Sequence, residues 1–290
     1  MNKLNQTITL NDGRTLGFAE KGPLSGKPVF HFNGFPGSRL EITLIDDNIL
    51  NKLNVRLIGV DRPGMGLSDF KKDRTLLDWP DDILELANYL NLKEFAIEGV
   101  SGGSPYSLAC AFKIPEYLTS CAVIGGIGPM DFKKVVGSSL IYSIIKRFYF
   151  LFRISMYFQG KTARNIKKME SKWKKSFNEL PQADQNTLND PINLSMLLKE
   201  GAEAFKQGSK GVSYEGRLYT YPWQFKLEDI TPDLKVFIFH GELDTIVPIT
   251  IAKSVSHLIP NTISKIYPEE GHYSVPINHI QEILSLILNL

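Results

Sequence analysis

Ser101 lies at the centre of a Gly-x-Ser-x-Gly pattern, Gly99-Val100-Ser101-Gly102-Gly103, which follows a short apolar run and precedes a stretch with helical periodicity. A serine at the corner between a buried strand and a helix can be held in a strained backbone conformation with its hydroxyl exposed. The flanking glycines let strand and helix pack closely there. The pattern therefore predicts a nucleophilic serine. Because the same pattern is frequent by chance, a base, an acid and two amide donors must accompany it.

An acid and a base follow later in the chain. Asp244 comes just after the apolar run 236–239, and His272 comes just after the run 263–267. Each is therefore expected on a loop at the end of a strand, and the chain order is Ser, Asp, His. Asp244 could instead only cap the helix expected from Pro248, and His272 could be a loop histidine that bonds to the backbone. The arrangement favours the catalytic alternative for both residues.

Two amide donors are predicted beside the serine. One is the amide of Gly102, directly after Ser101. The other is the amide of Phe35, in the Gly-rich turn 33–38 that follows the apolar run 28–32. Two such donors can stabilise the negative oxygen that develops when a carbonyl group is attacked.

These parts together predict acyl transfer to water. His272, held in one tautomer by Asp244, would take the proton of Ser101 as the hydroxyl attacks an acyl carbon, and would return it to the leaving group. A carboxylic ester is the simplest substrate for this chemistry. No metal ion or cofactor is needed.

Four segments of the chain resemble the α/β-hydrolases that carry a cap, and the resemblance covers nearly the whole sequence. The turn Asn33-Gly34-Phe35-Pro36-Gly37 is similar to the family's oxyanion turn, and 61–68 (Asp-Arg-Pro-Gly-Met-Gly-Leu-Ser) is similar to its Gly-rich loop after the fourth strand. Ser101, Asp244 and His272 match its triad. In one departure, Asn33 stands where the family usually has a histidine.

Further residues have expected roles, one from the resemblance and the others from the sequence itself. Asp131, just after the sixth expected core strand, is an alternative acid, because some hydrolases of this fold take their carboxylate from that place. Asp61 and Arg62 are expected to form a buried pair that braces the following loop. The remaining histidines are expected to be structural or exposed, namely His31, His240, His257 and His279.

Short apolar runs alternate with helical periodicity along most of the chain, which predicts an α/β fold with a mostly parallel central sheet flanked by helices. Helices are expected over 81–90, from Ser104 to about Lys113, and at the C-terminus as far as Leu290. The strands are expected at 7–10, 14–20, 28–33, 55–60, 94–99, 121–127, 234–240 and 262–267.

The alternation stops between about Pro129 and Lys226, where helical periodicity alone remains. The sequence therefore predicts an α/β core at 1–128 and 231–290, with an inserted helical cap at 129–230. The stretch 131–230 has seventeen Lys and Arg against ten Asp and Glu, although the whole chain has a net charge of only +2. Most of the excess lies in 131–175, beside aromatic residues such as those of 148–152.

Two interpretations of this basic, aromatic stretch are open. It could contact an anionic membrane surface or attract acidic substrates. It could also be an ordinary cap helix with its apolar side on the active site and its lysines in water, and this interpretation is favoured because the apolar stretch is too short and interrupted to span a bilayer. Nucleic-acid binding is not expected, because no recognisable module accompanies the charge.

The composition is that of an ordinary globular protein. The 290 residues are 43% hydrophobic and 22% charged, so the chain can bury a substantial core. Cys110 and Cys121 lie in apolar settings without metal-ligand spacing, which predicts buried thiols and a reducing compartment. The first residues contain no apolar signal segment. These features predict a cytoplasmic protein, and they say nothing about its oligomeric state.

The substrate is less well determined. A Ser nucleophile argues against dehalogenases and epoxide hydrolases that use a carboxylate. The segments 203–208 and 221–230 resemble the cap ending of a large bacterial hydrolase subfamily without a defined substrate. A mainly apolar pocket is expected from the aromatic residues near the motifs, namely Phe35, Tyr106, Trp223 and Tyr273. Three hypotheses follow: a carboxylesterase for small or medium apolar esters, a hydrolase of C–C bonds in β-diketone-like metabolites, and a ligand-binding module without catalysis.

Overall fold

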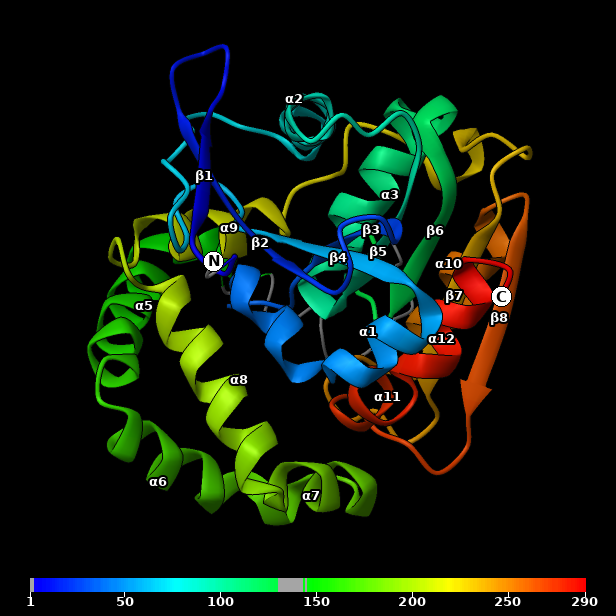
Figure 1. Cartoon of the computed structure of the whole chain (residues 1–290). Helices are drawn as coiled ribbons and strands as arrows, with labels where there is room; N and C mark the ends of the chain where they lie inside the picture. Colours follow the sequence, from blue (N-terminus) through cyan, green and yellow to red (C-terminus); the bar gives the residue numbers. More distant parts are fainter. Residues whose placement is uncertain (1–2, 130–142, 144) are drawn as a thin grey trace.

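A single eight-stranded sheet forms the centre of the molecule (Figure 1). The computed structural model describes residues 3–129, 143 and 145–290. The strand order is β1-β2-β4-β3-β5-β6-β7-β8. β1 and β2 pair antiparallel, as do β2 and β4, and all other pairs are parallel. The strands are β1 (Gln6–Thr9), β2 (Thr15–Lys21), β3 (Lys27–Phe32), β4 (Val55–Val60), β5 (Phe95–Val100), β6 (Leu118–Ile124), β7 (Val236–Gly241) and β8 (Thr262–Tyr267).

Helices cover both faces of this sheet, which explains why its inner strands consist mostly of apolar residues. On one face, α1 (Asp47–Leu53) and α12 (Ile280–Ile287) pack against residues such as Val29 and Phe237. The other face packs against α2 (Trp79–Tyr89), α3 (Ser104–Lys113) and α10 (Ile249–Leu258). The expected fold class, an α/β sheet between helical layers, is confirmed.

The predicted elements agree with the observed ones apart from their ends. The largest shift of a strand is at β6, which begins at Leu118 rather than 121. The C-terminal helix α12 ends at Ile287 rather than at Leu290, because Asn289 has a positive φ of 51° and reverses the chain. Cys110 and Cys121 are buried, and burial raises the pKa of both thiols.

A group of helices, here called the cap, lies between β6 and β7. In Figure 1 its helices α5 to α8 form the left and lower part of the molecule, away from β7 and β8 on the right. Within the described part of the segment between β6 and β7 there is no strand. The cap consists of α5 (Tyr149–Ala163), α6 (Ile166–Ser176), α7 (Gln182–Asn189), α8 (Pro191–Ala204) and α9 (Lys210–Leu218).

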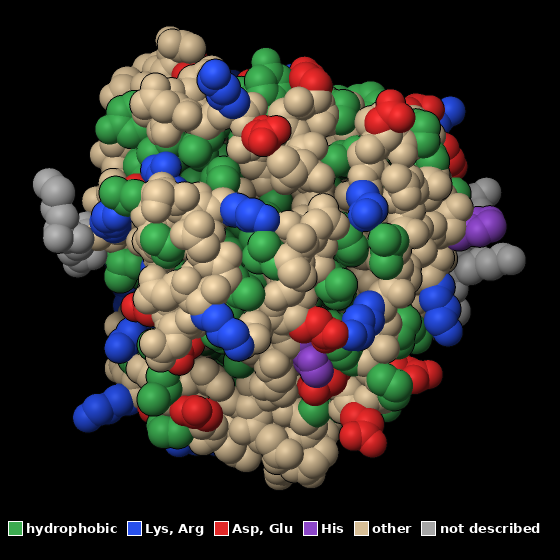
Figure 2. Space-filling model, turned by 45° about the vertical axis from the view of Figure 1, so that its right-hand side comes forward, with side chains coloured by type: hydrophobic (Ala, Val, Ile, Leu, Met, Phe, Trp, Pro, Cys, Tyr) green, Lys and Arg blue, Asp and Glu red, His purple; other side chains and the backbone are tan. Residues whose placement is uncertain are grey.

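Short helices connect these elements and shape the loops around the site. α11 (Ser274–Asn278) follows β8 and contacts α7 of the cap. The 3₁₀ turns are η1 (Arg39–Leu44), η2 (Leu76–Asp78), η3 (Ser101–Gly103), η4 (Pro115–Tyr117), η5 (Phe177–Glu179) and η6 (Leu227–Asp229). Among the described residues no helix is both long and apolar enough to cross a bilayer. Figure 2 turns the side of the molecule that carries β8 and α10 toward the reader, and on this side acidic and basic side chains are interspersed.

Candidate active site

Ser101 stands at the corner between β5 and α3, where the sequence pattern predicts a strained turn. Its φ is 49°, in the left-handed region that only a few non-glycine residues adopt. The flanking glycines are required by close packing: a Cβ at Gly99 would lie 2.4 Å from Oγ of Ser107, and one at Gly103 would lie 2.0 Å from the carbonyl oxygen of Phe32. The backbone therefore presents the hydroxyl of Ser101 beyond the end of the sheet.

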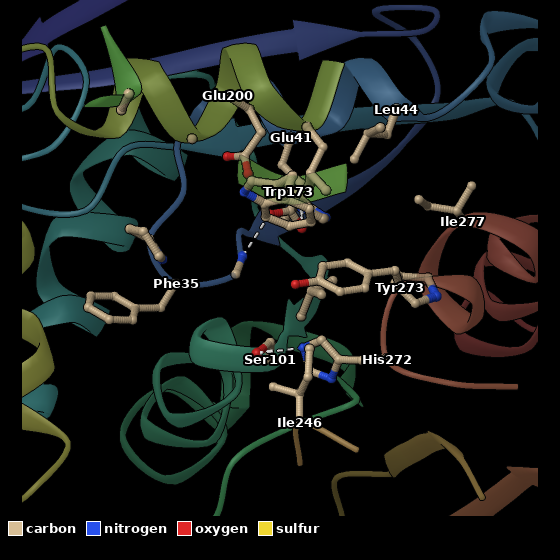
Figure 3. A pocket seen from close by; sticks show the side chains of 18 of the residues that line it. Phe35, Glu41, Leu44, Ser101, Trp173, Glu200, Ile246, His272, Tyr273 and Ile277 are labelled. Atoms are coloured by element: carbon tan, nitrogen blue, oxygen red, sulfur yellow. Dashed lines mark hydrogen bonds and ion pairs between the residues drawn. The ribbon is translucent and has the colours of Figure 1, made fainter. Parts of the chain in front are cut away.

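The three side chains expected to form a triad lie in hydrogen-bond contact, and Figure 3 shows the contact between Ser101 and His272. Nε2 of His272 is 3.1 Å from Oγ of Ser101, and Nδ1 of His272 is 2.7 Å from Oδ2 of Asp244. The other carboxylate oxygen of Asp244 accepts the amides of Ile246 and Val247, at 2.8 Å each. Asp244 therefore both orders its own loop and faces the imidazole. The amides that it accepts precede α10, which has no side-chain cap, so Asp244 does not cap that helix.

A second histidine, His240, lies beneath the carboxylate of Asp244. Its Nε2 is 2.8 Å from the carbonyl oxygen of Val247 and 3.5 Å from Oδ2 of Asp244. Burial lowers the pKa of His240. A neutral ring that donates from Nε2 adds no second positive charge beside Asp244.

The predicted oxyanion turn is held from two sides. Arg62 donates to the carbonyl oxygens of Asn33 (2.5 Å) and Gly34 (2.8 Å), and Glu41 accepts the amide of Gly34 at 2.8 Å. Among the described residues the amide of Phe35 has no acceptor. A Cβ placed on Gly102 would be 3.2 Å from the nitrogen of Phe35, so the two predicted donors are neighbours beside Ser101.

A buried charged cluster supports this turn from β3. His31 lies between Glu98 on β5 (Nδ1 to Oε1, 2.8 Å) and Glu41 on η1 (Nε2 to Oε1, 3.2 Å). Burial alone would lower the pKa of His31, but the hydrogen bonds to Glu41 and Glu98 raise it to about 10. The charged imidazole thus fixes Glu41, which in turn holds the amide of Gly34. His31 lies two residues before Asn33, which occupies the position where the resemblance would place a histidine.

A cavity of about 220 Å³ lies above Ser101 and is lined by residues of both the core and the cap. Phe35 and Tyr273 line it, as expected, and in Figure 3 the ring of Tyr273 extends toward its centre. α6 contributes Met169 and Trp173, which also line the cavity. Burial raises the pKa of Tyr273, and its hydroxyl has no hydrogen-bond partner within the described part of the chain.

The other two aromatic residues expected in the pocket lie elsewhere. Tyr106 is fully buried in α3, where its hydroxyl contacts Arg74 (2.6 Å) and Glu215 (3.0 Å). Trp223 packs against Phe225 in the hydrophobic core beside α3. The expectation that they line the pocket is wrong. It rested on their nearness to the motifs in sequence, but both side chains belong to the hydrophobic core beside α3.

The expected pair of Asp61 and Arg62 is also wrong. Asp61 pairs with Arg39 (2.8 Å) and accepts the amide of Leu67 at 2.8 Å, so it does brace the Gly-rich loop. Arg62 turns to the cap and pairs with Glu215 on α9 at 2.8 Å. Burial would raise the pKa of Glu215, but Arg62 and Arg74 lower it below its usual value. This ion cluster joins the core to the cap.

Asp184 on α7 of the cap is a residue that the sequence did not reveal. Its carboxylate is fully buried and accepts the main-chain amides of His272 (2.9 Å), Tyr273 (2.9 Å) and Ser274 (2.8 Å). A Cβ at Gly271 would lie 2.3 Å from this carboxylate. The loop that carries the histidine is therefore fastened to the cap.

Glu200 on α8 is a second residue found only in the structure. It lines the cavity, and its Oε2 accepts the amide of Ser38 at 2.9 Å. Burial raises the pKa of Glu200 well above its usual value, and the nearby charge of Glu41 acts in the same direction. This burial favours the protonated form of the side chain, which extends from α8 toward the cavity (Figure 3).

The remaining residues considered from the sequence do not join the site. Asp131 lies outside the described residues. His257 is exposed on α10, and His279 contacts Glu270 at 2.8 Å. In the described ranges no cluster of His, Cys, Asp or Glu is arranged to hold a metal ion.

The similarity of this chain to known proteins extends over most of its length. The family model described as "alpha/beta hydrolase fold" matches residues 27–278. No curated protein matches the sequence. An esterase from Exiguobacterium antarcticum is similar in structure, with a TM-score of 0.73 at 19% identity, over 99% of this chain and 98% of that one.

Two further solved structures have a similar fold. An esterase from Rhodococcus has a TM-score of 0.69 at 17% identity, over 99% of both chains. A meta-cleavage product hydrolase from Pseudomonas fluorescens has a TM-score of 0.69 at 19% identity, over 99% of this chain and 98% of that one. At these identities the likeness concerns the fold. The family match over most of the sequence, together with the sheet order and the serine turn, shows that this chain belongs to the α/β-hydrolase fold family.

Proposed function

We propose that this protein is a serine carboxylesterase that cleaves small or medium uncharged esters. The observation that carries the proposal is the unbroken contact from Asp244 through His272 to Ser101 at the floor of a cavity between core and cap. The two nearby esterase folds agree with it. The reaction would use no metal ion or cofactor.

The geometry supports the following steps. His272 accepts the proton of Ser101 at Nε2 as Oγ attacks the ester carbonyl, while Asp244 stabilises the imidazolium that forms. The amides of Phe35 and Gly102 stabilise the developing oxyanion. His272 then gives its proton to the leaving alcohol, which leaves an acyl group on Ser101. Water, deprotonated by the same ring, attacks that acyl group and releases the acid.

The lining of the cavity favours an uncharged substrate. It is mostly apolar, and among the described lining residues there is no Lys or Arg. Its one cation, His31, already lies between two glutamates. An anionic substrate would therefore lose its hydration without gaining a counter-ion. Glu200, whose protonated form is favoured by burial, offers a polar group to an uncharged ester instead.

Hydrolysis of short p-nitrophenyl esters tests the proposal. Ser101→Ala should reduce kcat by about 10³-fold or more, because it removes the nucleophile. Ser171→Ala, at an exposed position on α6, is the matched control and should retain activity. A fluorophosphonate probe should label the native protein and leave Ser101→Ala unlabelled. Full ester turnover by Ser101→Ala would refute the assignment.

A C–C bond hydrolase is the second candidate. The same residues would serve it, and the meta-cleavage product hydrolase from Pseudomonas fluorescens has a similar fold. Cleavage of a β-diketone panel with negligible ester turnover would select this alternative. A folded protein that neither turns over these substrates nor reacts with the fluorophosphonate would instead be a ligand-binding module.

A further inference from the structure

The cap helix α5 is apolar on both of its sides. Its inner residues, Met156, Gly160 and Ala163, are buried, and they pack against other parts of the cap and against Met65 of the core. Its outer residues are large and apolar too, and they are between 39% and 70% exposed. The α5 outer face is formed by Phe150, Leu151, Ile154, Tyr157 and Phe158. A row of large apolar side chains exposed along one helix is unusual at a protein surface, so the α5 outer face calls for a partner.

The charge around this face is strongly one-sided. Residues 145–176 contain ten Lys and Arg and one acidic residue, Glu170, and all ten basic side chains are exposed. Glu170 pairs with Lys174 at 2.6 Å. The other nine basic side chains have no carboxylate partner among the residues that the structure describes. The basic residues are Lys146, Arg147, Arg153, Lys161, Arg164, Lys167, Lys168, Lys172, Lys174 and Lys175.

We infer that α5 and α6 dock the protein on the surface of an anionic lipid bilayer. An outer face of Phe, Leu and Ile beside a dense set of Lys and Arg is the pattern by which a helix lies in the interface plane, with its apolar side among the acyl chains and its cations at the headgroups. α5 is not a helix that could cross the bilayer. Docking along the surface is the mode that its length allows.

Charge argues against the other occupants of this face. A second copy of the chain would place one strongly basic segment against another, and this repulsion opposes association. A nucleic acid would satisfy the cations but would leave the aliphatic side chains Leu151 and Ile154 uncovered. An anionic bilayer satisfies both the apolar and the charged part of the surface.

Docking would place the cavity next to the lipid. The opposite sides of the same two helices line it, with Gln159 and Ala163 from α5 and Met169 and Trp173 from α6. The helices that touch lipid on one side would thus face the substrate on the other. This inference concerns where the protein acts and holds whichever reaction the site performs.

Co-sedimentation with vesicles tests the inference. The native protein should bind vesicles of phosphatidylcholine mixed with phosphatidylglycerol at least about tenfold more tightly than vesicles of phosphatidylcholine alone, and added salt should weaken binding. The double variant Phe150→Gln/Phe158→Gln should lose about tenfold or more in binding to the anionic vesicles. The triple variant Lys167→Gln/Lys168→Gln/Lys172→Gln should bind more weakly and respond less to salt.

Exposed residues of the core provide the controls. Leu24→Gln/Tyr89→Gln changes two exposed apolar residues outside the cap, and Lys72→Gln changes an exposed cation there. Both should bind as the native protein does. All variants should keep the native thermal midpoint and the native turnover of a soluble ester without vesicles.

Three results would overturn the inference. The first is equal binding to neutral and anionic vesicles, or no binding to either. The second is native binding by Phe150→Gln/Phe158→Gln. The third is a concentration-dependent dimer that the same double variant abolishes, because a second copy would then cover the face.

Discussion

The carboxylate of Asp184, on a helix of the cap, accepts the main-chain amide of His272 at 2.9 Å. The amides of the next two residues bond to the same side chain. Three charge-assisted hydrogen bonds thus fix the loop that carries the proposed base, and Gly271 leaves the space that the carboxylate needs. The position of the imidazole therefore depends on the cap as well as on the core.

Asp184→Asn should lower kcat by about 10–100-fold with a small change in KM, because a misplaced imidazole weakens proton transfer more than substrate binding. An amide provides one acceptor oxygen and directs its NH₂ group at a backbone N–H. Ester kinetics and the rate of fluorophosphonate labelling measure the effect. Asp190→Asn is the control, since Asp190 caps α8 through the amide of Ile192. Native kcat in Asp184→Asn would show that the loop keeps its position unaided.

Tyr273→Phe should raise KM for esters severalfold and leave stability nearly unchanged. Its hydroxyl faces the cavity without an acceptor among the described residues, so substrate is its natural partner. Removing it costs about one hydrogen bond, or roughly 1 kcal/mol. Steady-state kinetics and thermal unfolding separate the two effects. Tyr157→Phe, on the exposed side of α5, is the control. Unchanged KM for every ester tested would argue against a substrate contact.

Glu215→Gln should lower the free energy of unfolding by about 3–5 kcal/mol, because it leaves two buried guanidinium groups without their counter-ion. Glu215 contacts Arg62 at 2.8 Å and Arg74 at 3.1 Å, and it accepts the hydroxyls of Tyr106 and Tyr219. Urea unfolding provides the measurement. The exposed Glu116 provides the control, and Glu116→Gln should behave as the native protein. A loss below 1 kcal/mol in Glu215→Gln would mean that water enters the cluster.

His31 should contribute a pH-dependent part of the stability. Since its pKa rises from 6.5 to about 10 on folding, its contribution is complete below about pH 6.5 and is lost as the pH rises toward 10. The native protein should therefore lose its advantage over His31→Gln between about pH 7 and pH 10, by on the order of 2–4 kcal/mol. Urea unfolding at several pH values measures this difference.

The exposed His257 is the matched control, and His257→Gln should follow the native curve. A constant gap between the native protein and His31→Gln across this range would mean that His31 is neutral in the fold. His31→Gln should also loosen the predicted oxyanion turn, because His31 holds Glu41, which accepts the amide of Gly34.

Local patterns made the arrangement of Ser101, Asp244 and His272 predictable. Asp244 and His272 each follow an apolar strand run, and the carboxyl ends of parallel strands meet at one edge of a sheet. Sequence order therefore sufficed to place both residues near Ser101. The turn that contains Phe35 was predictable too, because glycine and proline residues follow the apolar run 28–32 directly.

The contacts between cap and core could not be predicted in this way. Asp184 occupies a short polar helix, where an aspartate normally faces water. Glu215 lies 153 positions from Arg62, and no local pattern connects them. Tyr106 comes only five residues after Ser101 in sequence. Its hydroxyl nevertheless contacts Arg74 and Glu215, because the side of α3 that carries it is buried. Such partners are decided by tertiary packing alone.

The buried pairing of Arg62 with Glu215 also bears on attempts to exchange caps between members of this fold. Residues of the core supply both guanidinium groups of the cluster, while the cap supplies the carboxylate. A transplanted cap without an acidic residue at the position of Glu215 would leave Arg62 and Arg74 of the core buried without a counter-ion. Chimeras that alter substrate range should therefore carry α9 over unchanged and vary only the helices that roof the cavity.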